Sequence, residues 1–540
     1  MQTSTSPVEK ERKYIIILGS LMSGLGKGIV TASVGKELQS KGFRVVPVKF
    51  DGYLNVDCGT MNPYRHGEVF VLDDGAECDM DLGTYERFLN IDLKWDNNIT
   101  GGKIFRLLIE KERKGGYLGY DVQIVPHLTD EIKKWVKKVG GDFDADVVLV
   151  EVGGTVGDLE NSYFIEAMRQ LALENKNTTM FIQVTYVPTL ESVGEQKTKP
   201  TQHATRLLQS MGVQPDIIVC RGVGKLSANA RKKIALFCNV PEEAVITDPD
   251  CETIYKVPLL FESQMLSELI MQKLCMKSAK KDLKSWEGLV EKITNPKKNV
   301  TVGITGKYTA LKDAYVSIKE ALVHAGAHNN CRANIKWIET TEIEDGKQKV
   351  DVLKECDGII VPGGFGERGM EGKIQCIKYV RENNIPFLGL CLGMQLAVVE
   401  YARNVCGLER ANTTESDQNT KHPVVDLLPE QKRIVYKGAT MRLGGHDVQI
   451  KEGTLAHKLY GSTTARERFR HRWEINENYV KTLEEKGLVF SGKASGENIM
   501  QIAELTQHRF FLGTQFHPEF TSRLERPNPL FVGFLKACMK

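Results

Sequence analysis

Residues 14–28 have the sequence YIIILGSLMSGLGKG, an apolar run followed by a glycine-rich turn and a lysine. The apolar run predicts a buried β-strand, and the residues after Lys27 have the pattern of a helix. Glycines in such a turn let backbone N–H groups converge on phosphate oxygens, and the N-terminus of the following helix adds a favourable potential. The stretch therefore predicts a strand, a phosphate-binding loop and a helix, with Lys27 reaching the outer phosphates of a nucleotide.

Outward from this loop, short apolar runs alternate with helical segments, for example a helix over 28–40 and strands over 45–50 and 146–150. This alternation predicts an α/β protein with parallel sheets covered by helices. Residues 277–299, KSAKKDLKSWEGLVEKITNPKKN, are rich in lysine and poor in apolar residues, and a new strand begins after them. We expect an N-terminal domain at 1–276, a linker at 277–299 and a C-terminal domain at 300–540.

The composition is that of a globular protein, because 41% of the residues are hydrophobic and 26% are charged. Lys+Arg 72 against Asp+Glu 69 leaves a net charge of only +3, which indicates no nucleic-acid or membrane partner. The 12 cysteines form no CxxC pair, which is typical of reduced thiols. The first residues are polar and no apolar stretch is long enough to span a bilayer, so we expect a cytoplasmic protein.

The phosphate loop lacks its usual magnesium ligand, since Gly28 stands where a Ser or Thr normally follows the lysine. Carboxylates must then hold the metal. Glu151 follows the apolar run VVLV and precedes a glycine pair, at the end of a predicted parallel strand where ligands gather. Asp81 is a second candidate, although a helix cap or a solvated surface acid is an alternative for it. One or two carboxylates with phosphate oxygens suit Mg²⁺.

A second site is predicted in the C-terminal half. Residues 389–395, GLCLGMQ, have the form of a nucleophile elbow, which exposes the Cys391 sulfur at a helix N-terminus and favours the thiolate. His517 in QFHPE can act as the base and Glu519 can orient it. The glycine loop PGGFG at 362–366 can supply oxyanion donors. Each feature alone is ambiguous, but their joint occurrence indicates a cysteine glutaminase.

Several motifs together resemble the CTP synthase family across nearly the whole chain. They are SGLGKG, NVDCGTMNPYRHGEVFVLDDGAE, DLGTYERF, GGTVGDLE, GEQKTKPTQH, ANARKKIALFCNV, GKYTALKDAY, PGGFGERG, GLCLGMQLA, TMRLG and QFHPEFTSR. The resemblance implies a phosphate-loop, dethiobiotin synthetase-like amidoligase domain with a parallel sheet, joined to an α/β class I glutamine amidotransferase domain. It implies that CTP is made from UTP, ATP and glutamine through a 4-phosphorylated UTP, with Mg²⁺. It further implies GTP activation, CTP feedback inhibition and a homotetramer, and it leaves filament formation open.

The family's site residues carry over onto matching positions. Catalytic roles are implied for Lys27, Lys49, Cys391, His517 and Glu519. ATP contacts are implied for Gly24, Leu25, Gly26, Lys27, Gly28, Ile29 and Arg221, and magnesium ligation for Asp81 and Glu151. UTP or CTP contacts are implied for Ser23, Asp158, Glu160, Lys197, Thr198, Lys199, Gln202, Lys233 and Phe237. Glutamine contacts are implied for Gly364, Gln395, Glu415 and Arg472, and a place at the ammonia passage for His66.

The sequence departs from the family pattern at a few places. Ser20 and Gly52 replace a glycine and a proline, the segment 161–163 differs from that which usually follows the GDxE motif, and 438–439 is Gly-Ala instead of Gly-Gly. None of these changes removes a catalytic group. Ser20 and the segment 161–163 bear on nucleotide affinity and on CTP inhibition.

Two other functions compete with this interpretation. A related ligase could aminate a carboxylate, because a phosphate loop and a glutaminase do not specify the acceptor. The segment KTKPTQ favours UTP, since its lysines and hydroxyl groups suit a triphosphate. A nucleotide-gated assembly protein is the other alternative, and the intact triad argues against that as the whole role. Formation of CTP from UTP, ATP, magnesium and ammonia selects the first interpretation, and ATP turnover that is independent of UTP favours the other two.

Overall fold

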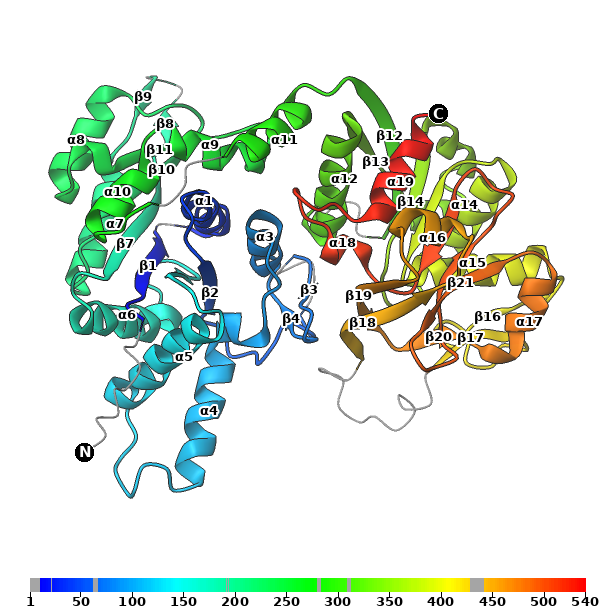
Figure 1. Ribbon diagram of the computed structural model, residues 1–540, viewed down its shortest axis with the longest axis horizontal. Helices are drawn as coiled ribbons and strands as arrows, with labels where there is room; N and C mark the ends of the chain where they lie inside the picture. The colour runs from blue at the N-terminus through cyan, green and yellow to red at the C-terminus, as the bar shows by residue number, and fades with distance from the viewer. Residues whose placement is uncertain are drawn as a thin grey trace, which may run out of the picture. The chain divides into compact units, whose positions relative to one another are not determined.

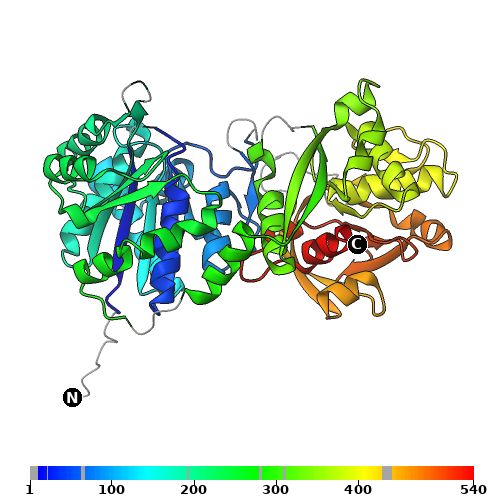
Figure 2. The ribbon, with the colours of Figure 1, turned by 90° about the horizontal axis from the view of Figure 1, so that it is seen from above.

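The structure is a computed structural model that describes residues 10–20, 22–61, 67–190, 192, 194–278, 283–307, 312–427 and 441–540 (Figure 1). It divides into two compact units. The first comprises the described residues up to Asp57, Thr84–Ile91 and Asp96–Gly288, and the second comprises those of Cys58–Gly83, Asp92–Trp95 and Leu289–Lys540. Figure 2 gives a second view of both units, which are described separately below.

The first unit is built on a seven-stranded sheet with the order β11-β10-β7-β1-β6-β2-β5. The strands are β1 (Lys13–Gly19), β2 (Val45–Asp51), β5 (Asn98–Thr100), β6 (Val147–Val152), β7 (Thr179–Tyr186), β10 (Ile217–Gly222) and β11 (Val245–Pro249). All neighbouring pairs are parallel. β6 is buried along its whole length, which explains why its first four residues, VVLV, are apolar on both faces.

Helices cover both faces of this sheet. They are α1 (Lys27–Ser40), α4 (Gly101–Arg113), α5 (Thr129–Asp142), α6 (Ser162–Glu174), α7 (Lys199–Ser210), α8 (Ala228–Cys238), α9 (Val257–Glu262) and α10 (Leu266–Lys273). Two further helices, α3 (Met80–Leu89) and α11 (Lys284–Thr294), each begin in one unit and end in the other. Val34 of α1 and Phe261 of α9 pack with Ile15, Ile17 and Leu149 in one core cluster. α5 and α6 pack against each other and against β2, β6 and β7. The short pair β8 (Thr189–Leu190) and β9 (Glu195–Gln196) precedes α7.

The second unit contains a nine-stranded sheet with the order β13-β12-β14-β15-β23-β22-β21-β18-β19. Its strands are β12 (Lys298–Gly306), β13 (Cys331–Glu339), β14 (Gly358–Val361), β15 (Phe387–Leu390), β18 (Arg442–Ile450), β19 (Thr464–His471), β21 (Val489–Ala494), β22 (Met500–Glu504) and β23 (Phe511–Thr514). The pairs from β13 to β23 are parallel, and those from β23 to β19 are antiparallel. A separate small sheet joins β16 (Asn412–Thr413), β17 (Pro423–Leu427) and β20 (Trp473–Ile475).

The helices of the second unit are α12 (Val316–Asn329), α13 (Thr340–Glu344), α14 (Met370–Glu382), α15 (Leu392–Asn404), α16 (Leu455–Tyr460), α17 (Glu477–Glu485), α18 (Pro518–Thr521) and α19 (Pro529–Cys538). α14 and α15 contribute Ile374, Ile377 and Val398 to one core cluster, while α12 and α19 contribute Ile318 and Phe534 to another. The sheet is therefore enclosed by two separate apolar cores.

A hairpin from the N-terminal half belongs to the second unit. β3 (Phe70–Val71) and β4 (Glu77–Cys78) pair antiparallel, and three arginines of β19 hold them. Arg466 Nη2 lies 2.8 Å from Asp73 Oδ2, Arg468 donates to the Val71 carbonyl at 3.1 Å, and Arg470 Nε lies 2.8 Å from Glu77 Oε1. Alternate residues of a strand lie on the same face of a sheet. The three arginines, which are two positions apart in β19, can therefore all contact the β3–β4 hairpin.

The predicted α/β class with a parallel N-terminal sheet is confirmed. The domain boundaries that the sequence predicts, at residues 276 and 300, stay a prediction. Among the described residues, no helix combines the length and the apolar character that crossing a bilayer requires.

Candidate active site

In the second unit, four neighbouring parallel strands end at one edge of the sheet. β12 leads into Lys307, β14 into the loop 362–366, β15 into Cys391 and β23 into Gln515 and His517. The carboxyl ends of adjacent parallel strands place their following residues side by side. This explains how residues more than a hundred positions apart in the sequence reach one site.

Cys391 occupies a strained turn between β15 and α15. Its φ is 50° and its ψ is −102°, values that are rare for a residue with a side chain. The flanking glycines permit the turn, because a Cβ on Gly389 would lie 2.8 Å from the backbone carbon of Gly393. The Cys391 N–H donates to the Thr514 carbonyl at 2.6 Å and fixes the turn to β23. The geometry is that of a nucleophile elbow.

His517 lies at the start of α18 and is held by Glu519. Its Nδ1 is 2.7 Å from Glu519 Oε1, and its backbone N–H donates to the Arg468 carbonyl at 2.8 Å. Burial lowers the pKa of His517, but the negative charges of Glu519 and of the Cys391 thiolate outweigh it and raise the pKa to about 10. With Glu519 at Nδ1, Nε2 is the ring nitrogen available for proton exchange with the sulfur.

Gln515 is a further neighbour of the sulfur. It is fully buried, and its Nε2 lies 3.6 Å from Cys391 Sγ. Gln395 Nε2 donates to Gln515 Oε1 at 3.2 Å and to the Trp473 carbonyl at 2.8 Å. Because Oε1 of Gln515 is used by Gln395, the NH₂ group of Gln515 faces the sulfur, where it can stabilise negative charge.

The glycine loop after β14 lies beside the triad. A Cβ on Gly363 would be 2.8 Å from His517 Cε1 and 3.5 Å from Cys391 Cβ, whereas a Cβ on Gly364 would meet no heavy atom closer than 3.8 Å. Gly363 is therefore the glycine that the catalytic side chains require at this place. Sequence reasoning singled out Gly364, and the structure adds Gly363 next to it.

A cavity of about 500 Å³ adjoins the triad. Cys391, His517, Gly364 and Arg472 line it, together with Gly59 of the segment that precedes the β3–β4 hairpin. Burial lowers the pKa of Arg472 and raises that of Glu415. Glu415 Oε1 accepts a hydrogen bond of 2.8 Å from the Gly366 N–H, which ties it to the glycine loop. The structure thus brings all four predicted glutamine-pocket residues, including Gln395, close to the triad.

In the first unit, the phosphate loop connects β1 to α1 as predicted. Gly24 and Gly26 have φ values of 74° and 81°, which suit glycine. Lys27 is the first residue of α1, and its Nζ donates to the Gly154 carbonyl at 2.6 Å. Leu25 and Gly28 are buried and Ile29 is half-buried. Ser23 is exposed beside this loop.

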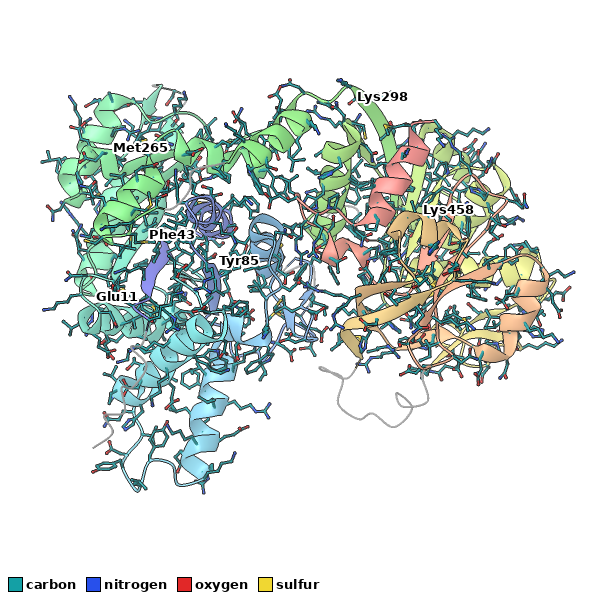
Figure 3. All side chains as sticks on the ribbon, viewed as in Figure 1. Glu11, Phe43, Tyr85, Met265, Lys298 and Lys458 are labelled. Carbon is teal, nitrogen blue, oxygen red and sulfur yellow. The ribbon has the colours of Figure 1, made fainter. Side chains whose placement is uncertain are left out.

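Glu151 is the centre of a buried polar cluster. It is the strand neighbour of Lys49, whose Nζ lies 2.8 Å from Glu151 Oε1. Thr31 Oγ1 donates to Glu151 Oε2 at 3.2 Å, and the Tyr85 hydroxyl donates to the same oxygen. Tyr85 is labelled on α3 in Figure 3. Sequence reasoning found the lysine and the glutamate, but it missed Thr31, one helical turn after Lys27, and Tyr85.

Asp81 lies in the first turn of α3, four residues before Tyr85, and its N–H donates to Asp79 Oδ1 at 2.9 Å. It is therefore one turn from a residue that contacts Glu151. Within the described part of the chain, no three His, Cys, Asp or Glu side chains form a metal-binding group. A metal at Glu151 would then need oxygen ligands from a bound phosphate.

Arg221 borders a small pocket of about 190 Å³ at the end of β10. Its Nη2 lies 2.8 Å from Asp250 Oδ1, and the pocket is also lined by Gly26 and Ile29 of the phosphate-loop region. Burial raises the pKa of Asp248, another lining residue, to about 6, although Arg221 lowers it. The structure brings Arg221 and the phosphate loop together, as predicted.

The predicted pyrimidine residues fall into two groups. Around α7, Gln202 Nε2 donates to Thr198 Oγ1 at 3.0 Å, Lys197 Nζ lies 2.5 Å from Glu195 Oε2, and Lys199 Nζ lies 5.5 Å from the Phe237 ring centroid. Lys233, like Phe237, is exposed on α8.

The second group precedes α6. Asp158 Oδ2 accepts from the Thr155 N–H at 2.9 Å, and Glu160 lines a cavity of about 540 Å³ with Tyr163. Burial and the charge of Glu160 raise the pKa of Tyr163 to about 12. Phe237 is not among the residues that line this cavity.

Two departures from the family pattern lie in contact. A Cβ on Gly52 would be 2.5 Å from Asn161 Oδ1 and 2.8 Å from Glu160 Cβ. Asn161 therefore fills the space that a side chain at position 52 would need. Ser20 is fully buried and its hydroxyl donates to the Val184 carbonyl of β7 at 3.0 Å. His66 and the segment 438–439 lie outside the described residues.

Comparisons with known proteins agree with this geometry. A family model described as CTP synthase N-terminus matches residues 13–276, and one described as glutamine amidotransferase class-I matches residues 310–537. The CTP synthase of Archaeoglobus fulgidus is 54% identical over 529 residues, with 98% of each chain covered. That of Methanocaldococcus jannaschii is 52% identical over 536 residues, with 98% of this chain and 99% of the relative covered.

Among solved structures, the glutaminase domain of Trypanosoma brucei CTPS with bound acivicin is 36% identical. The match covers 44% of this chain and 94% of that one, with a TM-score of 0.42.

A cysteine, histidine and glutamate triad on an α/β sheet, joined in one chain to a phosphate-loop domain, defines a glutamine amidotransferase coupled to a nucleotide-dependent synthetase. The chain belongs to the CTP synthase family. Members of this family are glutamine-hydrolysing, ATP-dependent ligases that convert UTP to CTP.

Proposed function

We propose that Cys391, His517 and Glu519 release ammonia from glutamine and that the first unit uses ATP to activate UTP for amination. The observation that carries the first half is the strained Cys391 turn, with φ of 50°, beside a histidine whose Nδ1 is held by Glu519 at 2.7 Å. The sulfur attacks the amide carbon of glutamine, the C–N bond breaks, and His517 donates a proton to the departing ammonia. Water then hydrolyses the thioester to glutamate.

The cavity residues fit the recognition of glutamine. Arg472 can pair with the substrate carboxylate and Glu415 with its ammonium group, because each carries the opposite charge. Gln395 holds Gln515 against the sulfur, and amide groups of the loop that contains Gly363 and Gly364 can stabilise the tetrahedral oxyanion. Losing one such donor typically costs ~10²–10³ in rate.

The first unit supplies the groups for phosphoryl transfer. Ammonia does not displace the C4 oxygen of UTP at a useful rate, so ATP first phosphorylates that oxygen and creates a leaving group. Lys27 and the loop amides from Gly24 to Ile29 bind the ATP phosphates, Lys49 neutralises developing charge, and Arg221 borders the nucleotide pocket.

Magnesium fits the donor set at Glu151. The buried carboxylate stands at the end of β6 beside the hydroxyl of Thr31 and the ammonium of Lys49, and an acid of this kind with phosphate oxygens is what Mg²⁺ prefers. We assign Glu151 and Asp81 as the residues that hold it. When bound, the metal would neutralise phosphate charge.

The residues Ser23, Lys197, Thr198, Lys199, Gln202 and Lys233 are assigned to the pyrimidine nucleotide. Their lysines suit a triphosphate, and Gln202 Oε1 is buried without a hydrogen-bond partner, which leaves an acceptor for a ligand. Asp158, Glu160 and Phe237 are assigned to inhibition by CTP. We further propose that GTP activates the protein and that it assembles into a homotetramer. His66 is assigned to the ammonia passage.

A product assay tests the reaction. CTP formation is followed by absorbance with UTP, ATP and Mg²⁺, once with glutamine and once with ammonia. Parent protein should make CTP from both nitrogen sources, and Cys391→Ala should make it only from ammonia. ATP turnover that does not depend on UTP would exclude UTP as the acceptor, and equal loss of both activities in the variant would exclude the division of labour.

Inhibition by CTP has its own test. Glu160→Ala should weaken CTP inhibition by roughly tenfold or more, the scale of one lost charge-assisted hydrogen bond, and should change the UTP requirement much less. Inhibition curves at fixed UTP are compared for the parent and the variant. Coincident curves, or an equal rise in the UTP requirement, would contradict a separate pocket for the cytosine ring.

A further inference from the structure

Two buried lysines lie behind the glycine loop of the glutaminase. Lys373 belongs to α14 and is 3% exposed, and Lys307 follows β12 and is 8% exposed. Burying an ammonium group is costly unless charges or dipoles around it compensate. Neither residue belongs to the triad or to the glutamine pocket assigned above.

Both lysines bind backbone carbonyls of this one loop. Lys373 Nζ donates to the Pro362 carbonyl at 3.3 Å. Lys307 Nζ donates to the carbonyls of Phe365 and Gly366, the latter at 3.3 Å. Three of the five carbonyls in the loop 362–366 thus point at the two cations.

The direction of a carbonyl fixes the direction of the next N–H, because both lie in the peptide plane and point to opposite sides of the C–N bond of a trans peptide. The peptide between Phe365 and Gly366 illustrates this: its carbonyl binds Lys307 and its N–H donates to Glu415 at 2.8 Å. By the same geometry, a Pro362 carbonyl that points at Lys373 turns the Gly363 N–H away from Lys373. Gly363 is the glycine that lies against Cys391 and His517.

The charges around Lys373 also favour a role at the site. Burial, together with the charge of Lys307, lowers the pKa of Lys373 to about 8, although Cys391, Glu415 and Cys376 of its own helix raise it. The geometry places this cation beside the nucleophile, because Lys373 binds the Pro362 carbonyl and a Cβ on the next residue, Gly363, would lie 3.5 Å from Cys391 Cβ. A cation at this place favours the thiolate and the negative charge that develops during the attack.

We propose that Lys373 and Lys307 are positioning residues of the glutaminase. Lys373 holds the Pro362 carbonyl so that the Gly363 amide faces the oxygen of the reacting carbonyl group, and Lys307 holds the other end of the loop, where the Gly366 amide binds Glu415. Lys373 also stabilises negative charge at Cys391. This inference rests on the proposed hydrolysis of glutamine at Cys391. It assigns a function to two lysines that act through the loop and do not touch the substrate.

The test compares Lys373→Met with Lys378→Met. Methionine matches lysine in length but carries no charge, and Lys378 is an exposed lysine of the same helix. We expect Lys373→Met to lower kcat for glutamine hydrolysis by about tenfold or more, with KM changed less than about threefold, since a lost transition-state interaction lowers kcat. Lys378→Met should match the parent, and ammonia-dependent CTP synthesis should be equal in all three proteins.

A second readout separates charge stabilisation from packing. Alkylation of Cys391 by iodoacetamide is followed by peptide mass spectrometry as a function of pH, and its midpoint should move to higher pH in Lys373→Met. A kcat within twofold of the Lys378→Met value, with an unchanged midpoint, would overturn the proposal. If Lys373→Met also loses ammonia-dependent synthesis, the variant Lys373→Arg, which keeps the positive charge, is measured next. Recovery of kcat for glutamine hydrolysis in that variant supports a role for the charge, and a kcat that does not recover contradicts it. A parent without glutaminase activity would instead refute the proposed function.

Discussion

Lys49 and Glu151 are register partners on the adjacent strands β2 and β6, and their side chains form an ion pair of 2.8 Å at the edge of the first sheet. Both are buried, with 5% and 0% exposure. An apolar pair of similar volume often stabilises a fold more than a buried ion pair does. The ion pair at the carboxyl end of these strands therefore indicates a functional role.

Glu151→Gln should stop ammonia-dependent CTP synthesis, with a loss of roughly 10²-fold or more, because the amide keeps the hydrogen-bonding shape but removes the charge. Asp81→Asn should do the same, and both variants should retain a basal glutaminase activity. Synthesis is measured with ammonia at saturating ATP and Mg²⁺, with the exposed Glu174→Gln as the matched control. Normal ATP-dependent turnover in both variants would show that the metal assignment is wrong.

Gly363→Ala should abolish glutaminase activity, because its new Cβ would lie 2.8 Å from His517 Cε1 and displace the imidazole. Gly364→Ala should lose much less, since its Cβ would meet no heavy atom within 3.8 Å. The two neighbouring substitutions are compared by glutamate release, with ammonia-dependent synthesis as the measure of intact folding. Equal losses would mean that the distance to His517 does not decide the effect.

Glu519→Gln should lower stability in a pH-dependent way. The pKa of His517 is raised from 6.5 to about 10, so the charged pair contributes its full stability below about pH 6.5 and loses it as the pH rises through about 10. Breaking a buried pair costs ~3–5 kcal/mol. The melting temperatures of parent and variant should therefore differ most at pH 6 and converge toward pH 10. A difference that is constant over this range would contradict the assigned pKa.

Gly52→Ala should destabilise the first unit, because the added methyl group overlaps Asn161 Oδ1 and Glu160 Cβ. Overpacking of this kind typically costs ~1–3 kcal/mol. Asn161→Ser in the same chain should restore part of the loss, since it removes one of the two overlaps. Thermal unfolding of the two single variants and the double variant forms a mutant cycle. Strictly additive effects would show that the side chains at positions 52 and 161 do not interact.

Local sequence patterns were sufficient to predict the structural features that depend only on residues close together in the sequence. The phosphate loop, the Cys391 elbow and the strand that ends at Glu151 each follow from spacing within about ten residues. Thr31 could have been found, because it lies one helical turn after Lys27 on the same face. Gln515 could also have been found, since it lies two positions before His517 and directly follows the strand β23.

Other residues carried no local signal. Lys373 has the appearance of an ordinary surface lysine in a helix, and only the packing of α14 behind the glycine loop buries it. The β3–β4 hairpin has strands of two residues each, too short for a period-two pattern, so its place on β19 depends on tertiary contacts. The contact of Gly52 with Asn161 likewise joins positions more than a hundred residues apart.

Because the β3–β4 hairpin belongs to the second unit, one cut in the chain cannot separate the two units. The chain passes between the units after residues 57, 83, 91, 95 and 288. A gene cut at the linker would therefore give a C-terminal fragment that lacks Gly59, Thr60, Met61, Glu68 and Val69 from the wall of its own cavity. Under the proposed function, ammonia released in such a fragment would meet solvent where this wall is missing and would be protonated there. Residues that precede the linker in the sequence therefore complete the cavity beside the triad, and a cut at the linker would separate them from it.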